Sequence, residues 1–447
     1  MKGRFFQSGW IAYPLRKPFG HALFALAIAL AVLPAGYEAV RIGAASMLGA
    51  LGKPADIRLA MAFDPADPAL DERMGRIGQT ALEASPAESV PWFRKAAALE
   101  PGNGWYWESL GLACEFAGER RCATSAFSRA LSLDPMAPRA LWLAANHELL
   151  IGSDAEALSH FRRLLAMDSG YAEAVFAVCL RAYGNPQLMA ARILPASSSP
   201  ALKLAFVNFL ARRSDFQPAD RFWSGLASGH ARFDFSLADP YLEKLISSGR
   251  IAQAARVWRD LRRLGILPAG GGKTGNLVFN PGFESPPLNA GFGWRLRTVP
   301  YVDAEFADPS AHGGMRCLRI DYAVAENEAS EPVYELIPVS GDQTYRLIAW
   351  VRSRAISSDS GPRLRVVDPQ HAACPPAQTE SAEGTTPWHE VSVTFSTCAQ
   401  TNLVRLSLWR PRGDEFPNRI SGHFWLDDVS LKPVSKSSLP PSRDATR

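Results

Sequence analysis

The sequence lacks the short motifs that mark common catalytic sites. His-Glu-x-x-His and Gly-x-Ser-x-Gly are both absent. The eight histidines are scattered, and none has the spacing of a metal-ligand set. We therefore expect a protein that is not an enzyme. A carboxylate pair for glycoside hydrolysis cannot be recognised from sequence, because the two groups are related by their distance in space and not by their spacing in the chain.

The chain also lacks a strong excess of charge of either sign. It carries 48 Lys and Arg against 44 Asp and Glu, a net charge of +4. This balance is too even to indicate a nucleic-acid partner, and we expect none.

Cysteine is present, but not in a metal-binding pattern. No two of the six cysteines form a Cys-x-x-Cys pair, which weakens zinc-binding and thioredoxin-like interpretations. Cys374 and Cys398 lie in neighbouring segments, and Cys114 and Cys122 flank one helical turn. Both pairs are candidate disulfides if the compartment is oxidising. The alternative is six thiols, most of them buried.

One long apolar run lies near the N-terminus. Residues 1–18 are basic and contain no acid, and residues 19–40 are largely apolar. The apolar run is just long enough to cross a hydrocarbon core of ~30 Å. Since Lys and Arg concentrate on the cytoplasmic side, we expect a single-pass anchor in a bacterial inner membrane, with the bulk of the chain in the periplasm. A cleaved signal peptide and a buried helix are the alternatives.

The middle of the chain repeats itself. Phe93, Phe127 and Phe161 are spaced 34 residues apart, and Pro101 and Pro135 keep the same step. A fixed period of this length is the signature of tetratricopeptide repeats, which are pairs of antiparallel helices.

The repeat at about 104–137 resembles that family most closely. Small residues would let its two helices approach, and aromatic residues would fill the groove between repeats. The matching residues are Trp107, Leu110, Gly111, Ala123, Phe127, Ala130 and Pro135.

We interpret 55–265 as a solenoid of such repeats, degenerate beyond residue 185, that offers a concave face to a protein or peptide partner. The resemblance implies binding and not chemistry. Five tryptophans are interpreted as packing residues: Trp92, Trp105, Trp142, Trp223 and Trp258.

Residues 266–275 are predicted to form a Gly-rich linker. Gly272-Lys273-Thr274 imitates the end of a phosphate-binding loop, but position 267 is Leu where that loop requires Gly. A strand and not a helix is expected to follow, so we predict no nucleotide site.

From residue 276 the sequence alternates between apolar and polar residues and is enriched in β-branched and aromatic types. Many short strands without helices predict an antiparallel β-sandwich over 276–432, followed by a disordered tail at 433–447. The fold class is therefore multidomain, α then β. The predicted strands are 277–280, 301–306, 316–322, 333–338, 344–352, 363–367, 389–395, 403–409 and 422–431.

Two segments bound this region. The opening segment, 276–284, reads Asn-Leu-Val-Phe-Asn-Pro-Gly-Phe-Glu, and the closing segment, 424–431, reads Phe-Trp-Leu-Asp-Asp-Val-Ser-Leu. They resemble the first and last strands of jelly-roll, galactose-binding-like carbohydrate-binding modules appended to cellulases and xylanases. Gly293-Trp294, 345–352 and 388–395 extend the resemblance, which implies polysaccharide as the ligand class.

In that family a structural calcium often ties the first strand to the last, and the resemblance places Glu284 and Asp427 at the matching positions. Calcium prefers carboxylate and carbonyl oxygens. Asp427 shares strand parity with Val429 and Leu431, so its carboxylate is predicted to point inward and to need a partner. Calcium is the predicted partner, and hydrogen bonds from Asn276 or backbone amides are the alternative.

Sugar binding needs exposed aromatic faces and polar groups for hydroxyls. Strand parity places Trp350 and Arg352 on the outer side of 344–352, and Arg405 and Trp409 on the outer side of 403–409. If these strands share a sheet, the four residues form a carbohydrate-binding face, and its arginines suit an acidic polysaccharide. The alternative is that the tryptophans pack under loops or repeats and the arginines are solvated. Three other tryptophans are predicted to be in the core: Trp294, Trp388 and Trp425.

These features predict a non-catalytic periplasmic scaffold that binds a protein through the repeats and glycan through the sandwich, in assembly or export of cell-surface polysaccharide. The alternative is an envelope assembly factor that binds only proteins and uses the sandwich as a spacer or docking module.

Overall fold

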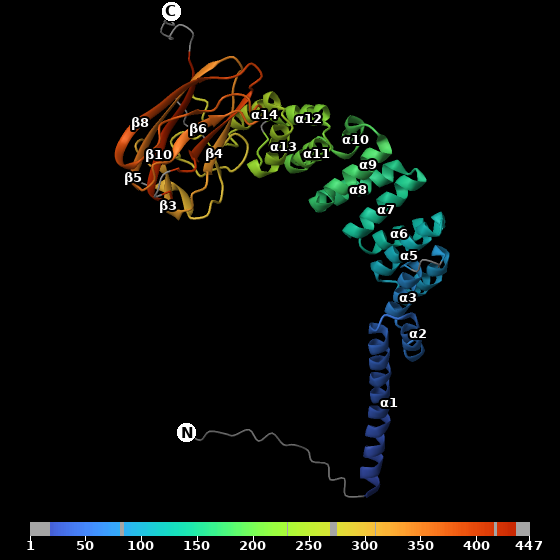
Figure 1. Ribbon diagram of the computed structural model, residues 1–447. Coiled ribbons are helices and arrows are strands. Elements are labelled where there is room, and N and C mark those ends of the chain that lie inside the picture. Colours follow the sequence, from blue (N-terminus) through green and yellow to red (C-terminus); the bar gives the residue numbers. More distant parts are fainter. Residues whose placement is uncertain are drawn as a thin grey trace, which may run out of the picture. The chain divides into compact units, whose positions relative to one another are not determined.

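The computed structural model describes residues 18–80, 85–229, 231–268, 275–308, 310–414 and 418–434. The predicted cytoplasmic segment, most of the predicted linker and most of the predicted tail lie outside these residues. Contacts divide the chain into two compact units, 1–193 and 194–447. The first is helical, and the second contains four helices followed by strands (Figure 1).

Helix α1 (Pro18–Ala50) contains the apolar run. Its residues 22–50 are long and apolar enough to cross a membrane, and a signal sequence near the N-terminus passes the same test. The end of α1 has a second role: Ala45 is buried in a small core with Ile57 and Ala60 of α2 (Pro54–Phe63). The apolar helix is therefore continuous with the first packed helix of the unit.

Paired helices follow, as the repeat pattern predicts. The first unit contains α3 (Pro68–Thr80), α4 (Val90–Leu99), α5 (Gly104–Phe116), α6 (Arg120–Leu133), α7 (Pro138–Ile151), α8 (Asp154–Met167), α9 (Ala172–Tyr183) and α10 (Pro186–Ile193). The second begins with α11 (Pro200–Arg212), α12 (Phe216–Ser228), α13 (Phe235–Ser247) and α14 (Ile251–Arg263).

The pair α5 and α6 shows why small residues recur in the repeat. Gly111 lies against the ring of Phe127, and a Cβ at position 111 would come within 2.4 Å of the ring atom Cε1. Leu110, Ala123 and Ala130 are buried around this contact. The packing predicted for the repeat signature is confirmed.

The second unit ends in two antiparallel five-stranded sheets. Sheet A has the order β1-β4-β9-β6-β7, and sheet B has the order β2-β3-β10-β5-β8. Sheet A contains β1 (Arg295–Leu296), β4 (Ser330–Pro338), β6 (Arg363–Val367), β7 (Ala377–Gln378) and β9 (Leu403–Arg410). Sheet B contains β2 (Val302–Asp308), β3 (Cys317–Ala325), β5 (Thr344–Ile356), β8 (Gly384–Ser396) and β10 (Ile420–Pro433).

Eight of the predicted strands are present, but the first, 277–280, is not a regular strand. The side chain of Asn276 is the physical reason, because it takes the place of a backbone partner. Its Oδ1 accepts hydrogen bonds from Leu431 N and Val278 N, and its Nδ2 donates to Val429 O. The opening segment therefore lies beside β10 through the side chain of Asn276 and two backbone hydrogen bonds, from Leu277 N to Leu431 O and from Val429 N to Pro281 O.

Helices α13 and α14 pack directly on the sandwich within the second unit. The ring of Trp258 lies 5.1 Å from that of Phe279 and 5.8 Å from that of Phe292, between ring centroids. Glu243 accepts hydrogen bonds from Gly291 N and from Arg295 Nη2. The compact units thus divide between α10 and α11, and not at the predicted linker.

Candidate functional site

The outer side of sheet A gathers arginine and aromatic side chains from neighbouring strands. Even-numbered residues of β6 and β9 are buried, and the side chains of Arg363, Arg365, Arg405 and Trp409 between them are half-buried and point outward, as strand parity predicts. Tyr334 of β4 pairs with Ser407, and Ser407 pairs with Arg365, which sets these side chains in one row across the sheet. The residues of this surface, called the arginine face below, are Arg297, Glu331, Tyr334, Arg363, Arg365, Arg405 and Trp409.

Guanidinium groups lie over the rings of the arginine face. Cζ of Arg365 is 4.6 Å from the ring centroid of Trp409, and Cζ of Arg297 is 4.4 Å from that of Tyr334. Arg405 approaches the same Tyr334 ring at 6.0 Å. All three distances lie in the range of cation–π contacts, in which a planar guanidinium stacks on an aromatic ring.

The charges of the arginine face are only partly compensated. Glu331 pairs with Arg297 at 2.9 Å and with Arg405 at 3.4 Å. Within the described part of the chain, neither Arg363 nor Arg365 has a carboxylate at ion-pair distance. The face is therefore positively charged.

Trp350 and Arg352 do not belong to this face, because β5 pairs with β10 and β8 in sheet B while β9 lies in sheet A. The prediction of one surface containing both Trp350 and Trp409 is wrong. Strand parity identifies the side of a strand that faces outward, but it does not identify the sheet to which the strand belongs.

On sheet B, Trp350 is covered. The imidazole of His312 stacks on its ring with centroids 3.9 Å apart, and Nδ1 of His312 lies 2.8 Å from Oδ2 of Asp428. Trp388, predicted to be in the core, is half-buried beside the same imidazole. These contacts hold the segment before β3 against sheet B, so the ring of Trp350 is not an open aromatic face.

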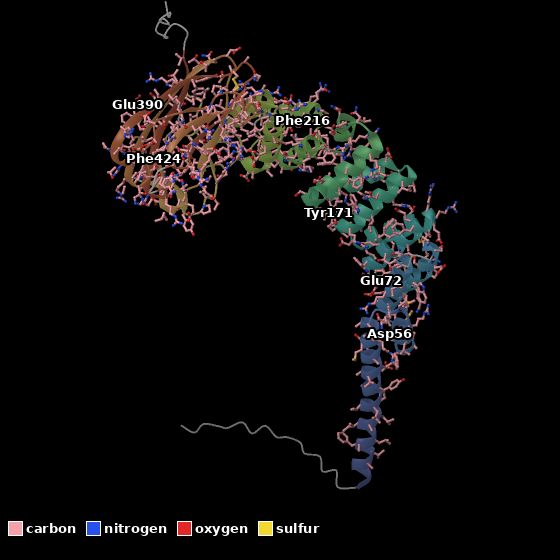
Figure 2. All side chains as sticks on the ribbon, viewed as in Figure 1. Asp56, Glu72, Tyr171, Phe216, Glu390 and Phe424 are labelled. Carbon is pink, nitrogen blue, oxygen red and sulfur yellow. A yellow bond between two sulfur atoms is a disulfide. The ribbon has the colours of Figure 1, made fainter. Side chains whose placement is uncertain are left out.

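Trp425 is also on the outer side of sheet B, although it was predicted to be in the core. It is buried beneath Arg352, whose Cζ lies 4.7 Å from its ring centroid, and beside Arg354 at 5.8 Å. Trp294, in contrast, is in the core as predicted. Figure 2 marks Glu390, which pairs with Trp350 across β5 and β8, and the core residue Phe424.

Glu284 and Asp427 both accept hydrogen bonds from the segment 312–316. Oδ2 of Asp427 accepts from His312 N at 2.8 Å and from Gly313 N at 2.9 Å. Oε1 of Glu284 accepts from Met315 N at 2.7 Å. Two carboxylates far apart in the sequence thus hold one loop.

Asp427 is fully buried, as predicted, but the parity argument for it is wrong. A bulge between Asp427 and Ser430 shifts the register of β10, with Asp428 at a positive φ of 48°. Asp427 therefore lies on the side of Trp425, under the segment 312–316, and not with Val429 in the core. Burial raises the pKa of its carboxyl, against the three amides that donate to it.

The oxygens of Glu284 and Asp427 fit calcium in type, and Glu284 is exposed. Amide hydrogen bonds, the alternative partner, already join both carboxylates to the segment 312–316. Calcium at these two residues stays a prediction.

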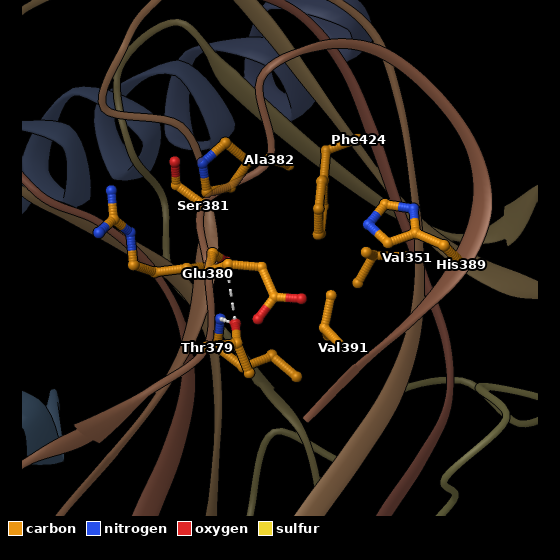
Figure 3. Close-up of a pocket in the computed structure, with 11 residues that line it drawn as sticks. Val351, Thr379, Glu380, Ser381, Ala382, His389, Val391 and Phe424 are labelled. Atoms are coloured by element: carbon orange, nitrogen blue, oxygen red, sulfur yellow. Dashed lines mark hydrogen bonds between the residues drawn. The ribbon is translucent and has the colours of Figure 1, made fainter. Parts of the chain in front are cut away.

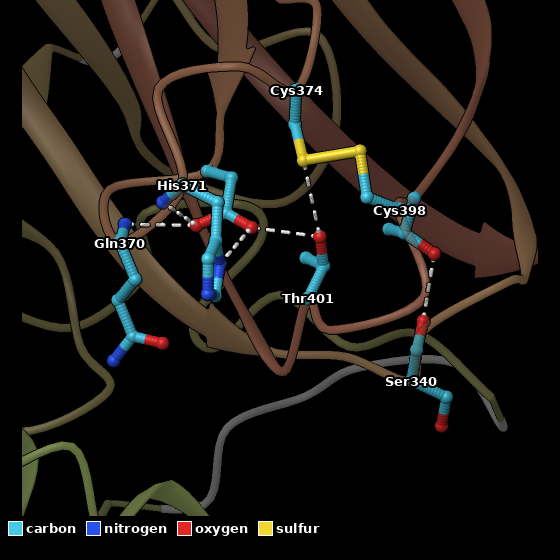
Figure 4. Close-up of polar contacts among 8 residues, drawn as sticks. Ser340, Gln370, His371, Cys374, Cys398 and Thr401 are labelled. Atoms are coloured by element: carbon cyan, nitrogen blue, oxygen red, sulfur yellow. Dashed lines mark hydrogen bonds and ion pairs between the residues drawn. A yellow bond between two sulfur atoms is a disulfide. The ribbon is translucent and has the colours of Figure 1, made fainter.

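Both candidate disulfides are present: Cys114–Cys122 and Cys374–Cys398. The second is part of a polar cluster at one end of the sandwich (Figure 4). Oδ2 of Asp368 accepts from Thr401 Oγ1 at 2.7 Å and lies 3.0 Å from His371 Nδ1. These hydrogen bonds, with those of the backbone amides that follow Asp368, lower the pKa of its carboxyl in spite of its burial. The hydrogen bonds of Asp368 therefore hold the loop that begins at this residue against Thr401.

A cavity between the two sheets is lined by His389, Glu380, Val351 and eight other residues (Figure 3). Its volume is about 10 Å³, about the space of one water molecule. A sugar does not fit there.

In the first unit, Trp105 at the start of α5 is the exposed exception among the five tryptophans interpreted as packing residues, with 46% of its surface accessible. Arg139 of α7 lies over its ring at 4.0 Å and pairs with Glu108. The indole Nε1 of Trp105 donates to Glu72 of α3. Burial raises the pKa of Glu108, against the effect of Arg139. Trp105 and its partners are a candidate contact surface for a protein, which helical spacing alone did not indicate.

Comparisons with known proteins give no family model and no curated protein that matches the chain. The solved structures similar to parts of the chain include tetratricopeptide-repeat proteins for the helical part and carbohydrate-binding modules for the β part.

Three solved structures illustrate the range. YrrB, a tetratricopeptide-repeat protein with an unusual peptide-binding site, is 18% identical over 40% of this chain and 88% of its own, with a TM-score of 0.31. TmCBM61, solved with β-1,4-galactotriose, is 19% identical over 36% of this chain and 99% of its own, with a TM-score of 0.24. The enzymatically active domain of a bacteriophage CBA120 tailspike is 12% identical, with a TM-score of 0.27, and only 21% of it is covered. At these scores the likenesses carry no functional argument.

Proposed function

We propose that this protein is a non-catalytic scaffold anchored in a bacterial inner membrane, which binds glycan through its sandwich and a protein through its helical repeats. The arginine face carries the glycan part, because it is an outward-facing aromatic and polar surface on the sheet A side. The sequence resemblance to carbohydrate-binding modules supports the same ligand class. Assembly or export of cell-surface polysaccharide is the process that fits both.

The proposed location is the periplasm, with α1 uncleaved. The two disulfides support an oxidising compartment. Continuity of α1 with the packed hairpin of α1 and α2 supports retention of the whole helix. Intact-mass measurement of the mature protein tests this: a mass lacking residues before about 35 would show a cleaved signal and a secreted protein.

A glycan array with the full chain in detergent tests the sandwich. We expect binding that is lost in Trp409→Ala, because Arg365 of the arginine face lies over that ring, and kept in Trp350→Ala, because the ring of Trp350 lies on sheet B and is covered by His312. Loss in Trp350→Ala alone would move the site to sheet B. Flat arrays over neutral and acidic glycans would favour the alternative, an assembly factor that binds only proteins.

Structural calcium at Glu284 and Asp427 belongs to the same proposal. An ion that binds the folded state stabilises it by an amount that grows with the logarithm of the ion's concentration over its dissociation constant. We expect the melting temperature of the full chain to rise with calcium and fall with chelator, and the response to be lost in Glu284→Gln. Identical melting curves in calcium and chelator would show that amide hydrogen bonds alone join Glu284 and Asp427 to the segment 312–316.

A further inference from the structure

We infer that the arginine face binds a polysaccharide whose repeating units carry carboxylates. This inference rests on the proposed glycan function and narrows its ligand class. Three features of the face support it: the covered aromatic rings, the arginines without an ion pair and the distribution of the arginines over neighbouring strands.

The aromatic rings of the face are not bare platforms. A neutral pyranose stacks on an open ring face, but guanidinium groups lie 4.6 Å from the Trp409 centroid and 4.4 Å from the Tyr334 centroid. A stacked guanidinium still presents the N–H groups along its edge. That edge matches a carboxylate, which accepts two parallel hydrogen bonds from it.

Two arginines of the face form no ion pair among the described residues, and the acids whose charges act on Arg363 (Glu383 and Asp359) lie beyond ion-pair distance. Glu331 serves Arg297 and Arg405, whereas Arg363 and Arg365 reach no carboxylate within the described ranges at ion-pair distance. Nε of Arg363 is buried without a hydrogen-bond partner, and burial lowers the pKa of this guanidinium. An anionic ligand would supply the missing charge.

The arginines are distributed as a polymer would need them. Arg365 lies on β6, and Arg405 lies on the adjacent strand β9. Tyr334 lies on β4, the next strand, and carries the guanidinium of Arg297 over its ring. Strands are spaced about 4.8 Å apart, so successive cationic groups follow one another across the sheet. A chain of charged sugars can therefore meet several of them at once.

The outer side of sheet B is compensated in part. Arg319 pairs with Asp321 at 2.9 Å, and Arg346 lies 3.9 Å from Glu390. Arg352 and Arg354 lie over the ring of Trp425 and have no carboxylate at ion-pair distance in the described ranges. His423 also contacts Asp321. The two sheets therefore differ in degree: two arginines of sheet B are paired with acids, whereas the arginine face has one acid, Glu331, for four arginines.

The test compares polygalacturonate with its methyl ester, which keeps the sugar backbone and removes the charge. The full chain in detergent is titrated with each polymer by calorimetry at two salt concentrations. We expect binding to the acid alone, weakened by salt because exposed charges are screened. Arg365→Ala should weaken it by about tenfold or more, the range expected for a lost charge-assisted hydrogen bond. Arg346→Ala, on sheet B, is the matched control and should leave affinity unchanged.

The other outcomes are equally decisive. Equal binding of the acid and the ester overturns the carboxylate inference and leaves glycan binding in place. Binding of inorganic polyphosphate as tightly as polygalacturonate shows general polyanion affinity and also overturns it. No binding to either polymer, with flat arrays, removes both the inference and the proposed glycan function. Arg365→Lys keeps the charge without the planar fork, so unchanged affinity in that variant would contradict the bidentate mode.

Discussion

At the scale of single residues, Glu335 is an unusual side chain for the interior of a sandwich. It is fully buried on β4, where its Oε1 accepts a hydrogen bond from Phe279 N at 2.7 Å. Its Oε2 has no hydrogen-bond partner in the described part of the chain. Burial raises the pKa of this carboxyl well above its usual range, and the amide of Phe279 opposes that only in part.

The raised pKa of Glu335 predicts a pH-dependent stability. Because folding raises it, the stabilisation is fully present below the unfolded-state pKa of about 4.3 and is lost as pH rises through the folded-state value. Glu335→Gln keeps an acceptor for Phe279 N and removes the ionisation. We expect the wild type to lose more free energy of unfolding than the variant between about pH 5 and about pH 8 in urea titrations. Parallel pH profiles of the two proteins would contradict this.

Residue-scale predictions from sequence succeeded where alternation is regular and failed where it is interrupted. The outward directions of Arg405 and Trp409 follow from an unbroken strand. The side on which Asp427 lies could not be predicted, because the bulge at Asp428 shifts the register. The covering of Trp350 depends on His312, which comes from another segment of the chain.

At the scale of elements, the contact between α5 and α6 depends on the absence of a side chain at Gly111. Gly111→Ala would place a methyl group 2.4 Å from a ring atom of Phe127. We expect a loss of about 1–3 kcal/mol in unfolding free energy from overpacking, read from urea denaturation. Gly102→Ala is the control, because open space surrounds that position. Equal losses in both variants would show that the tight contact contributes nothing.

The packing of α13 and α14 on the sandwich offers a second test. Gly291 has a φ of +57°, and a Cβ there would lie 2.5 Å from a ring atom of Trp258. Gly291→Ala therefore adds a clash to the conformational cost, whereas Gly265→Ala, at φ +69° with open surroundings, carries the conformational cost alone. We expect a lower melting temperature for Gly291→Ala than for Gly265→Ala. The same melting temperature in both would contradict the contact.

Elements with strong periodicity were predictable from the sequence. The four helices of the second unit lie within the helical region predicted over 55–265. The two-residue strands β1 and β7 were missed, since two residues carry no alternation. The packing of α14 on the sandwich was missed as well, because a helical pattern identifies an apolar face without identifying what covers it.

At the scale of the whole molecule, each compact unit contains one disulfide and one buried thiol. Cys179 and Cys317 are outside the disulfides, and burial raises the pKa of Cys179 to about 12. Alkylation of the denatured, unreduced protein should therefore label two of the six cysteines, and prior reduction should make all six available by mass spectrometry. Six labels without reduction would place the chain in a reducing compartment and contradict the proposed location.

The contact between Trp258, Phe279 and Phe292 has a consequence for how this protein could have evolved. Binding modules joined by loose linkers can be exchanged by recombination without harm to either neighbour. Here a cut between α14 and the first strand would leave a large aromatic surface facing water on both fragments. The sandwich and the helices before it are therefore expected to be inherited together, and a transplanted sandwich would have to bring α13 and α14 with it.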